Sequence, residues 1–149
     1  MKRFSKAKQS GFTLVEIAIV LVIIGLLLAG VLKGQELIEN SKIKSIVNDM
    51  KAVQAAYNGY LDRYKAIPGD ETLATAAARG WGASAAGGGG NANGVLLITA
   101  AQTFANGGEQ RPFWRALRAS GLITGDPTGA AGAAGLPKHA GGGVMGVTS

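Results

Sequence analysis

Hydrophobic residues form an unbroken run near the start of the chain. The run covers residues 12–32, reads FTLVEIAIVLVIIGLLLAGVL, and contains a single charged residue, Glu16. A helix of this length spans about 31 Å, close to the hydrocarbon thickness of a bilayer. A cleaved secretory signal has a shorter apolar core, and a fully buried soluble helix needs a larger surrounding core than this chain can build. The run therefore predicts a membrane span.

The helical pattern continues beyond the run, but on one face only. Apolar residues recur there in steps of three and four, the spacing of an amphipathic helix. They are Leu37, Ile38, Ile43, Ile46, Val47, Met50, Val53, Tyr57, Tyr60, Leu61 and Tyr64. The first proline is Pro68, and Gly69 follows it, which together make a strong stop signal. We predict one helix over residues 12–64, apolar all round in its first part and one-sided in its second.

The remaining residues, 65–149, predict a small head. Eighteen of the 24 glycines lie in residues 80–149, so little of this region can form a regular core. A short helix is expected near residues 111–120, with Pro112 at its first position and Gly121 as its stop. Phe113 and Trp114 are expected to pack this helix onto the long one. Residues 95–98 predict a short strand or the start of a helix, and residues 143–149 the beginning of a strand.

Composition excludes several kinds of chemistry. There is no cysteine and one histidine, His139, which excludes disulfides, a cysteine nucleophile and a structural zinc site. The pair Asp70-Glu71 follows the Pro-Gly stop, where we expect a solvated turn or a helix N-cap. The stretch Asn91–Gly94 offers oxygen ligands for calcium, but an ordinary turn is the favoured interpretation. We therefore predict no enzymatic activity, no cofactor and no metal.

The net charge of +6 comes mostly from the first eleven residues. Lys2, Arg3, Lys6 and Lys8 lie there, and without them the balance is +2. The charge is therefore not a nucleic-acid footprint, and no nucleic-acid partner is predicted. Basic residues beside an apolar span stay in the cytoplasm, so the head is expected in the periplasm or outside the cell. Three lysines beyond the span oppose this orientation, Lys33, Lys42 and Lys44, but the leader cluster is denser and nearer.

The junction of the basic leader and the apolar run carries a specific motif. Gly11-Phe12-Thr13-Leu14-Val15-Glu16 combines a small residue, an aromatic residue, three uncharged residues and a glutamate at the start of an apolar helix. It resembles the class III signal peptide of type IV prepilins and pseudopilins. The resemblance implies that a prepilin peptidase removes residues 1–11 by cutting after Gly11 and methylates the new amino terminus at Phe12.

The same resemblance gives Glu16 a role in assembly. In the family, the amine created by cleavage pairs with the glutamate of a neighbouring subunit, so Glu16 would set subunit register. A pair between Phe12 and Glu16 of one chain is also possible at this helical spacing, and the sequence leaves both open.

Further pieces of the chain resemble a pseudopilin-like group. They are Ile67-Pro68-Gly69-Asp70, Glu109, Phe113-Trp114, Leu117, the stretch Ser120–Gly125 and Leu136-Pro137-Lys138. Two features differ from many major pilins: no proline occurs near Lys33, and no cysteine is available for a C-terminal disulfide loop. The family places an antiparallel sheet after these pieces, so we expect a truncated or minimal head.

Together these observations predict an α+β, pilin-like fold with one long N-terminal helix and a small glycine-rich head. The predicted function is a structural subunit of a type IV pilus or a type II secretion pseudopilus in the bacterial inner membrane. Its implied partners are the prepilin peptidase and methyltransferase, other pilin or pseudopilin subunits, and the inner-membrane assembly platform. The alternative is a single-pass membrane protein with a small periplasmic binding head and no filament role. Pilus and pseudopilus, and major and minor subunits, share these features.

Overall fold

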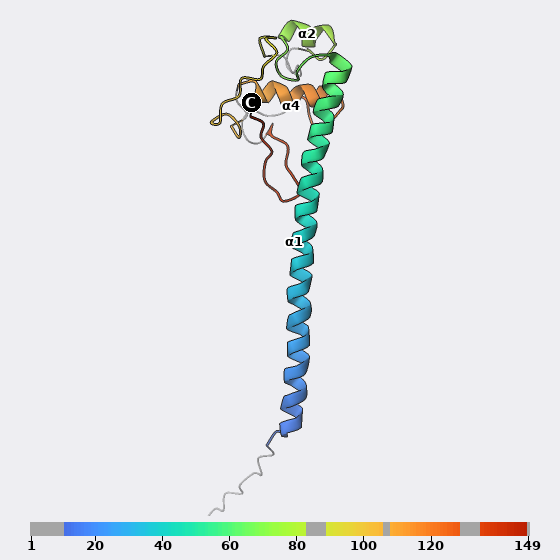
Figure 1. Cartoon of the computed structure of the whole chain (residues 1–149), viewed down its shortest axis with the longest axis vertical. Coiled ribbons are helices and arrows are strands. Elements are labelled where there is room, and N and C mark those ends of the chain that lie inside the picture. Colours follow the sequence, from blue (N-terminus) through green and yellow to red (C-terminus); the bar gives the residue numbers. More distant parts are fainter. Residues whose placement is uncertain (1–10, 83–88, 106–107, 129–134, 149) are drawn as a thin grey trace, which may run out of the picture. The chain divides into compact units, whose positions relative to one another are not determined.

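A computed structural model describes residues 11–82, 89–105, 108–128 and 135–148. The predictions for the basic leader, residues 1–10, and for the centre of the glycine-rich loop, residues 83–88, lie outside these ranges. Within them the helices are α1 (Leu14–Tyr64), α2 (Leu73–Ala78) and α4 (Gln110–Ala119) (Figure 1). The chain divides into an N-terminal unit, Met1–Ser41, and a C-terminal unit, Lys42–Ser149.

Helix α1 agrees closely with the helix predicted over residues 12–64. It begins two residues later than predicted, at Leu14, and ends at Tyr64 as predicted. Lys65 leaves the helix with a positive φ of 53°, just before the Pro-Gly stop, and its N–H donates to the carbonyl of Leu61. The helix contains an 18-residue window of mean hydropathy 3.0, and none of that window is buried. Its apolar side chains are therefore available to lipid or to other chains.

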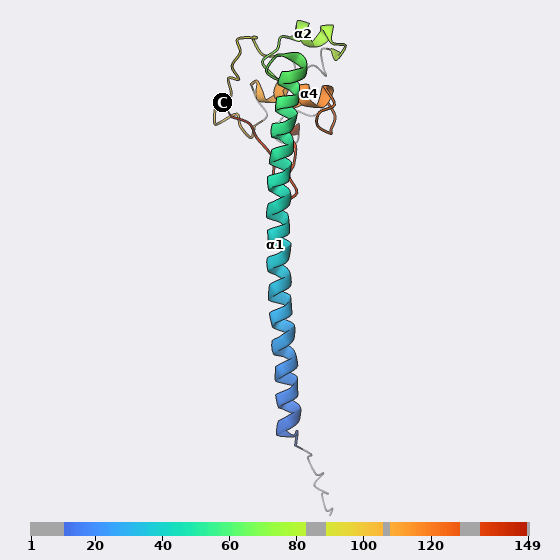
Figure 2. The ribbon, with the colours of Figure 1, turned by 45° about the vertical axis from the view of Figure 1, so that its right-hand side comes forward.

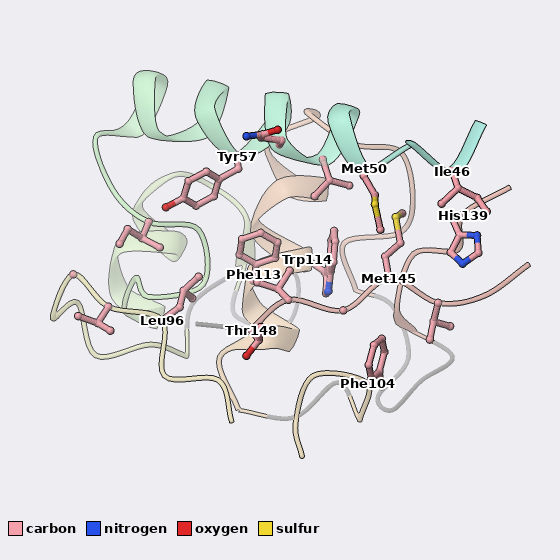
Figure 3. A pocket seen from close by; sticks show the side chains of 18 residues that line it. Ile46, Met50, Tyr57, Leu96, Phe104, Phe113, Trp114, His139, Met145 and Thr148 are labelled. Atoms are coloured by element: carbon pink, nitrogen blue, oxygen red, sulfur yellow. The ribbon is translucent and has the colours of Figure 1, made fainter. Parts of the chain in front are cut away.

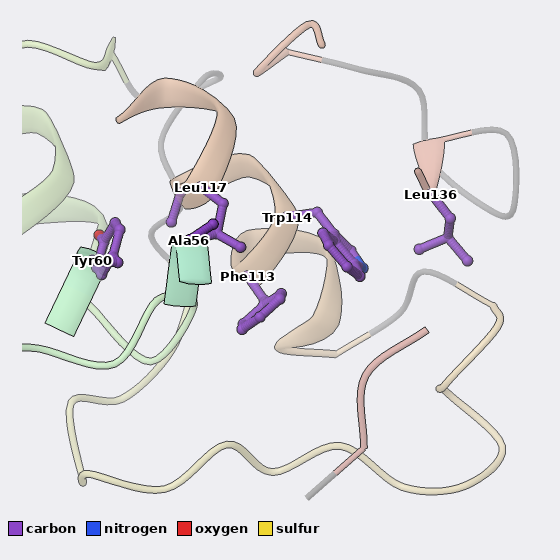
Figure 4. Close-up of a cluster of buried hydrophobic side chains, with 7 residues drawn as sticks. Ala56, Tyr60, Phe113, Trp114, Leu117 and Leu136 are labelled. Atoms are coloured by element: carbon purple, nitrogen blue, oxygen red, sulfur yellow. The ribbon is translucent and has the colours of Figure 1, made fainter. Parts of the chain in front are cut away.

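Helix α4 lies against the last turns of α1 and supplies most of the core of the C-terminal unit (Figures 1 and 2). The core is drawn in Figure 4, and its buried members are Ala56, Tyr60, Phe113, Trp114, Ala116, Leu117 and Leu136. The predicted packing of Phe113 and Trp114 onto the long helix is confirmed. The rings of Phe113 and Tyr57 lie 6.3 Å apart between centroids.

The two ends of α4 have different explanations. Pro112 was predicted at the first helical position but occupies the third, still within the first turn, where a missing N–H costs no helical hydrogen bond. The predicted stop at Gly121 is confirmed. Gly121 has a φ of 73°, and the N–H of Leu122 donates to the carbonyl of Leu117 at 3.1 Å. This is a Schellman motif, which favours glycine because the conformation is left-handed.

The described residues contain no β-strand, so the β part of the α+β prediction is not confirmed. One isolated antiparallel bridge joins Lys138 and Val144, near the strand predicted over residues 143–149. Residues 95–98 form neither a strand nor a helix. The N–H of Leu97 instead donates to the carboxylate of Glu109 at 2.6 Å, so a side chain takes the place of a sheet neighbour.

The prediction that Asp70-Glu71 forms a solvated turn or a helix N-cap is wrong. Both side chains are buried, at 4% and 6% exposure, and the N-cap of α2 is Thr72. The Glu71 carboxylate forms a bidentate ion pair with the Arg79 guanidinium and accepts a hydrogen bond from the Tyr60 hydroxyl at 2.5 Å. The guanidinium also lies 4.3 Å from the centroid of the Tyr64 ring. These contacts join the end of α1 to the chain around α2, and a buried carboxylate needs such partners to offset its lost hydration.

The Tyr60 hydroxyl makes the stability of the C-terminal unit sensitive to alkaline pH. Burial and the hydrogen bond to Glu71 raise the pKa of Tyr60 above its usual value. The unfolded tyrosine loses its proton near pH ~10, whereas the folded one keeps it. The stabilisation is therefore present below pH ~10 and is lost at higher pH, by at most about 1.4 kcal/mol per pH unit. In Tyr60→Phe we expect a flatter decline of unfolding free energy above pH ~10.

Denaturant titrations at a series of pH values test this expectation. Tyr57→Phe is the matched control, since it removes a tyrosine hydroxyl one turn earlier in α1. The control should keep the alkaline decline of the wild type. Equal slopes in the wild type and in Tyr60→Phe would contradict the role given to the Tyr60 hydroxyl.

Candidate processing and assembly site

The predicted cleavage site lies directly before α1. Residues 11–13 have no regular secondary structure, and the helix begins at Leu14. Gly11 is exposed, and the Phe12 side chain is 85% exposed. Proteases bind their substrates as extended chain, so the bond between Gly11 and Phe12 is available without unwinding a helical turn. An exposed bond outside the helix is compatible with cleavage after Gly11, and the cleavage itself stays a prediction.

Glu16 has a local partner that the sequence reasoning missed. Its carboxylate accepts hydrogen bonds from the N–H of Thr13 at 2.9 Å and from the Thr13 hydroxyl at 2.7 Å. The Thr13 hydroxyl in turn accepts from the N–H of Glu16 at 3.3 Å. This reciprocal arrangement is a capping box, which satisfies free N–H groups at a helix start. The spacing Thr-x-x-Glu is its sequence signature and could have revealed it.

The capping box explains how the uncleaved chain holds Glu16. In that chain the nitrogen of Phe12 belongs to a peptide bond, and it becomes an ammonium only after cleavage. Until then the Thr13 groups are the hydrogen-bond donors to the Glu16 carboxylate. Cleavage after Gly11 would leave Thr13 in place and add a positive charge one helical turn from Glu16. The Glu16 carboxylate can then accept hydrogen bonds either from Thr13 of its own chain or from a Phe12 ammonium. A role in setting subunit register requires that Glu16 can exchange the first partner for the second.

The polar residues of the C-terminal unit have structural partners. The Asp70 carboxylate accepts from the N–H groups of Asn93, at 3.2 Å, and Gly94, at 2.7 Å. The side chains of Asn91 and Asn93 accept from N–H groups two residues further on, so the ordinary turn predicted at Asn91–Gly94 is confirmed. N–H donors aimed at the carboxylate disfavour a cation there. No group of three His, Cys, Asp or Glu suitable for a metal occurs among the residues that the structure describes.

The single histidine stabilises a turn. His139 Nδ1 accepts from the N–H of Gly141 at 3.0 Å, and the N–H of the next residue, Ala140, donates to the Asp49 carboxylate at 2.8 Å. The two contacts hold the turn before the C-terminal residues against α1. No nucleophile lies among these contacts.

A second feature of the C-terminal unit is an open apolar cavity of about 800 Å³ (Figure 3). Its walls come from α1, the chain around Leu96 and Phe104, α4 and the C-terminal residues, and they include Met50, Trp114 and Met145. No local sequence pattern predicts this cavity, because its walls lie far apart along the chain.

Comparison with known proteins identifies the N-terminal segment. Residues 6–32 match the family model of the prokaryotic N-terminal methylation motif, the class III signal peptide of type IV pilins and pseudopilins. The match covers the junction, the capping box and the apolar run, and it leaves the C-terminal unit without a counterpart. No curated protein and no solved structure shows significant similarity to the chain. The N-terminal segment thus carries the motif of pilin-like precursors.

Proposed function

We propose that the chain is the precursor of a filament subunit of a type IV pilus or a type II secretion pseudopilus. The observation that carries the proposal is the methylation motif at residues 6–32, which includes the start of an exposed apolar helix. The predicted cut lies just before this helix, where residues 11–13 have no regular secondary structure. The mature subunit begins at Phe12 and carries a methylated amine. Its apolar helix anchors it in the inner membrane and then packs against other subunits.

The division of the chain follows from this proposal. Residues 1–11 are the cleaved leader, residues 12–32 the membrane span within the helix of residues 12–64, and residues 65–149 the head on the periplasmic side. The leader's basic residues hold the N-terminus in the cytoplasm. The partners are the prepilin peptidase and methyltransferase, other pilin or pseudopilin subunits, and the assembly platform of the inner membrane.

The alternative function is a membrane-anchored protein whose head binds a partner without entering a filament. The apolar cavity of the C-terminal unit favours it, because a binding head requires such a surface. The methylation motif would have no purpose in that protein beyond anchoring. The two functions therefore differ in whether the chain is cleaved after Gly11 and methylated at Phe12.

N-terminal mass spectrometry of membrane or filament material tests the proposed processing. We expect a chain that begins at Phe12 and carries one added methyl group. In Gly11→Val we expect the uncleaved precursor to accumulate. A Cβ at Gly11 would meet no other atom within 4 Å, so we expect this variant to keep the fold of the described residues.

Two results would contradict the processing. One is an intact Met1 terminus in cells that contain a prepilin peptidase. The other is a cut near Gly30, at the end of the apolar run, which would indicate an ordinary secretory signal.

A further inference from the structure

An exposed Asn-Gly pair lies in the turn that packs on Asp70. The chain contains three Asn-Gly pairs, at residues 58–59, 93–94 and 106–107. Asparagine before glycine is the dipeptide most prone to spontaneous deamidation, because glycine has no side chain to shield its backbone nitrogen. The first pair lies within α1, where helical hydrogen bonds hold the backbone, and the third lies outside the described residues. Asn93 and Gly94 are exposed and belong to no helix or strand. Their reactivity therefore depends on the hydrogen bonds of the turn itself.

A buried carboxylate holds the backbone nitrogen that deamidation would use. The N–H of Gly94 donates to Asp70 Oδ2 at 2.7 Å, and the N–H of Asn93 donates to Asp70 Oδ1 at 3.2 Å. Asp70 is 4% exposed, and its carbonyl accepts a further hydrogen bond from the N–H of Ala92 at 2.7 Å. A Cβ at Gly90 would collide with the Asp70 backbone, so the turn lies directly on this residue. The position of the Gly94 nitrogen is thus fixed from the protein interior.

These hydrogen bonds oppose each requirement of the reaction. Deamidation begins when the Gly94 nitrogen loses its proton and attacks the side-chain carbonyl carbon of Asn93. Loss of that proton beside the Asp70 carboxylate would place two negative charges next to each other, which is unfavourable. The side-chain carbonyl oxygen of Asn93 accepts from the N–H of Val95 at 2.9 Å, which fixes the orientation of the carbonyl to be attacked. The closed turn therefore protects Asn93, and the reaction requires that the turn opens.

We propose that Asn93 is a deamidation site and that Asp70 controls its rate by holding the N–H of Gly94. In the opened turn the Gly94 nitrogen gives its proton to solvent and forms a bond to Cγ of Asn93. The bond between Cγ and Nδ2 breaks, and the side-chain nitrogen leaves as ammonia, so that a cyclic imide remains. Water then opens the imide at one of its two carbonyl carbons. The products are aspartate and isoaspartate, and water is the only co-reactant.

The modification prevents the turn from closing on Asp70 as before. In isoaspartate the main chain runs through the former side chain, which adds one carbon between the N–H groups of residues 93 and 94. The two N–H groups then no longer match the two oxygens of the Asp70 carboxylate, and a second carboxylate lies beside it. A buried carboxylate that loses its donors destabilises the fold, so deamidation weakens the C-terminal unit irreversibly. This proposal is independent of processing at Gly11, and either proposal can fail without the other.

The first test compares the folded and the unfolded wild-type chain. The full-length protein is incubated in non-ionic detergent at mildly alkaline pH, with and without urea. Mass spectrometry of peptide fragments follows the replacement of an amide by a carboxylate and separates Asn93 from Asn106 on the same tryptic peptide. We expect deamidation of Asn93 to be at least about tenfold slower in the folded chain, because only the opened turn reacts. Asn58, within α1, is the internal reference for unfolding of the helix.

The second test changes the carboxylate that holds the turn. Asp70→Asn keeps the size of the side chain and removes its charge, and we expect it to accelerate deamidation of Asn93 about tenfold, with Asn58 unchanged. Loss of a hydrogen bond to a charged acceptor has an effect of this size. Asn91→Ala is the matched control. It removes a side chain that accepts from the N–H of Asn93 at 3.1 Å but leaves the contact of Gly94 with Asp70 in place, so the wild-type rate is expected.

A third measurement needs no variant. The N–H of Gly94 exchanges its hydrogen with solvent through the same opening of the turn that permits deamidation. We therefore expect the wild-type chain to protect the Gly94 amide from exchange and Asn93 from deamidation by similar factors. This comparison decides the role of Asp70 if Asp70→Asn also accelerates Asn58, which would indicate that the variant is unfolded.

Four results would overturn the proposal. The first is an equal rate at Asn93 with and without urea. The second is a rate in Asp70→Asn that is unchanged or lower, and a lower rate would identify Asp70 as a base that promotes the reaction. The third is the same acceleration in Asn91→Ala, which would mean that any loosening of the turn has this effect. The fourth is fast hydrogen exchange at Gly94 in a chain that deamidates slowly.

Discussion

Glu16→Ala is expected to be processed and membrane-inserted like the wild type, yet to enter filaments far more slowly. The substitution makes the span more apolar, so insertion is unchanged or improved. The variant loses the Glu16 carboxylate, which would pair with the Phe12 ammonium of a neighbouring subunit within an apolar helix bundle. Breaking one side of a buried ion pair costs ~3–5 kcal/mol, because the other charge stays uncompensated. At ~1.4 kcal/mol per tenfold, recruitment falls by about two to three orders of magnitude.

The capping box gives a competing explanation that one variant separates. Glu16→Ala also removes the side chain that caps the N–H of Thr13, at a cost of about 1 kcal/mol. Glu16→Gln removes the charge, but a glutamine can still form the capping box. If entry into filaments depends on the charge of Glu16, Glu16→Gln behaves like Glu16→Ala. If entry depends on the capping box, Glu16→Gln behaves like the wild type.

The measurements are filament yield and the fraction of chain that begins at Phe12, taken from the same cells. Glu16→Asp keeps the charge with a shorter reach, and we expect an intermediate yield. Wild-type yield in Glu16→Ala, with normal cleavage after Gly11, would make Glu16 an interfacial residue. The proposed filament function would then lose its main physical support.

The parts of the fold that follow from local signals could be predicted from the sequence. Residues 12–64 read as one helix because the apolar spacing never breaks before Pro68, and α1 ends at Tyr64. Helix α4 follows from its apolar anchors and from Gly121, which closes the Schellman motif. The motif at Gly11–Glu16 is local as well, and the family match at residues 6–32 confirms it.

The parts that depend on distant contacts could not be predicted. Asp70 and Glu71 look like a solvated pair in sequence, because their partners Gly94, Tyr60 and Arg79 lie 8 to 24 residues away. Helix α2 is too short to show a period. The cavity is formed by segments that lie far apart in the sequence and that only the fold brings together. A strand pattern at residues 95–98 gives no strand, since the carboxylate of Glu109 satisfies the backbone there.

Gly69→Ala is expected to destabilise the C-terminal unit more than the same change at any other described glycine that has a positive φ. Gly69 has a φ of 91°, and an added Cβ would lie 2.7 Å from the backbone nitrogen of Phe113 and 2.8 Å from the carbonyl oxygen of Glu109. These are backbone atoms at the start of α4, so they cannot move aside as a flexible side chain could. The left-handed conformation costs about 1–2 kcal/mol for alanine, and overpacking adds about 1–3 kcal/mol.

Gly121→Ala is the matched control for this prediction, and it separates the two costs. Gly121 also has a positive φ, 73°, but an added Cβ there would meet no atom within 4 Å. It should therefore lose only the conformational part, about 1–2 kcal/mol. Thermal unfolding followed by near-ultraviolet circular dichroism of Trp81 and Trp114 measures both variants in the full-length chain. If Gly69→Ala is no less stable than Gly121→Ala, the close approach of the Pro-Gly turn to α4 does not hold this unit together. The position of α4 against α1 would then have to rest on the buried side chains of Phe113, Trp114 and Leu117 alone.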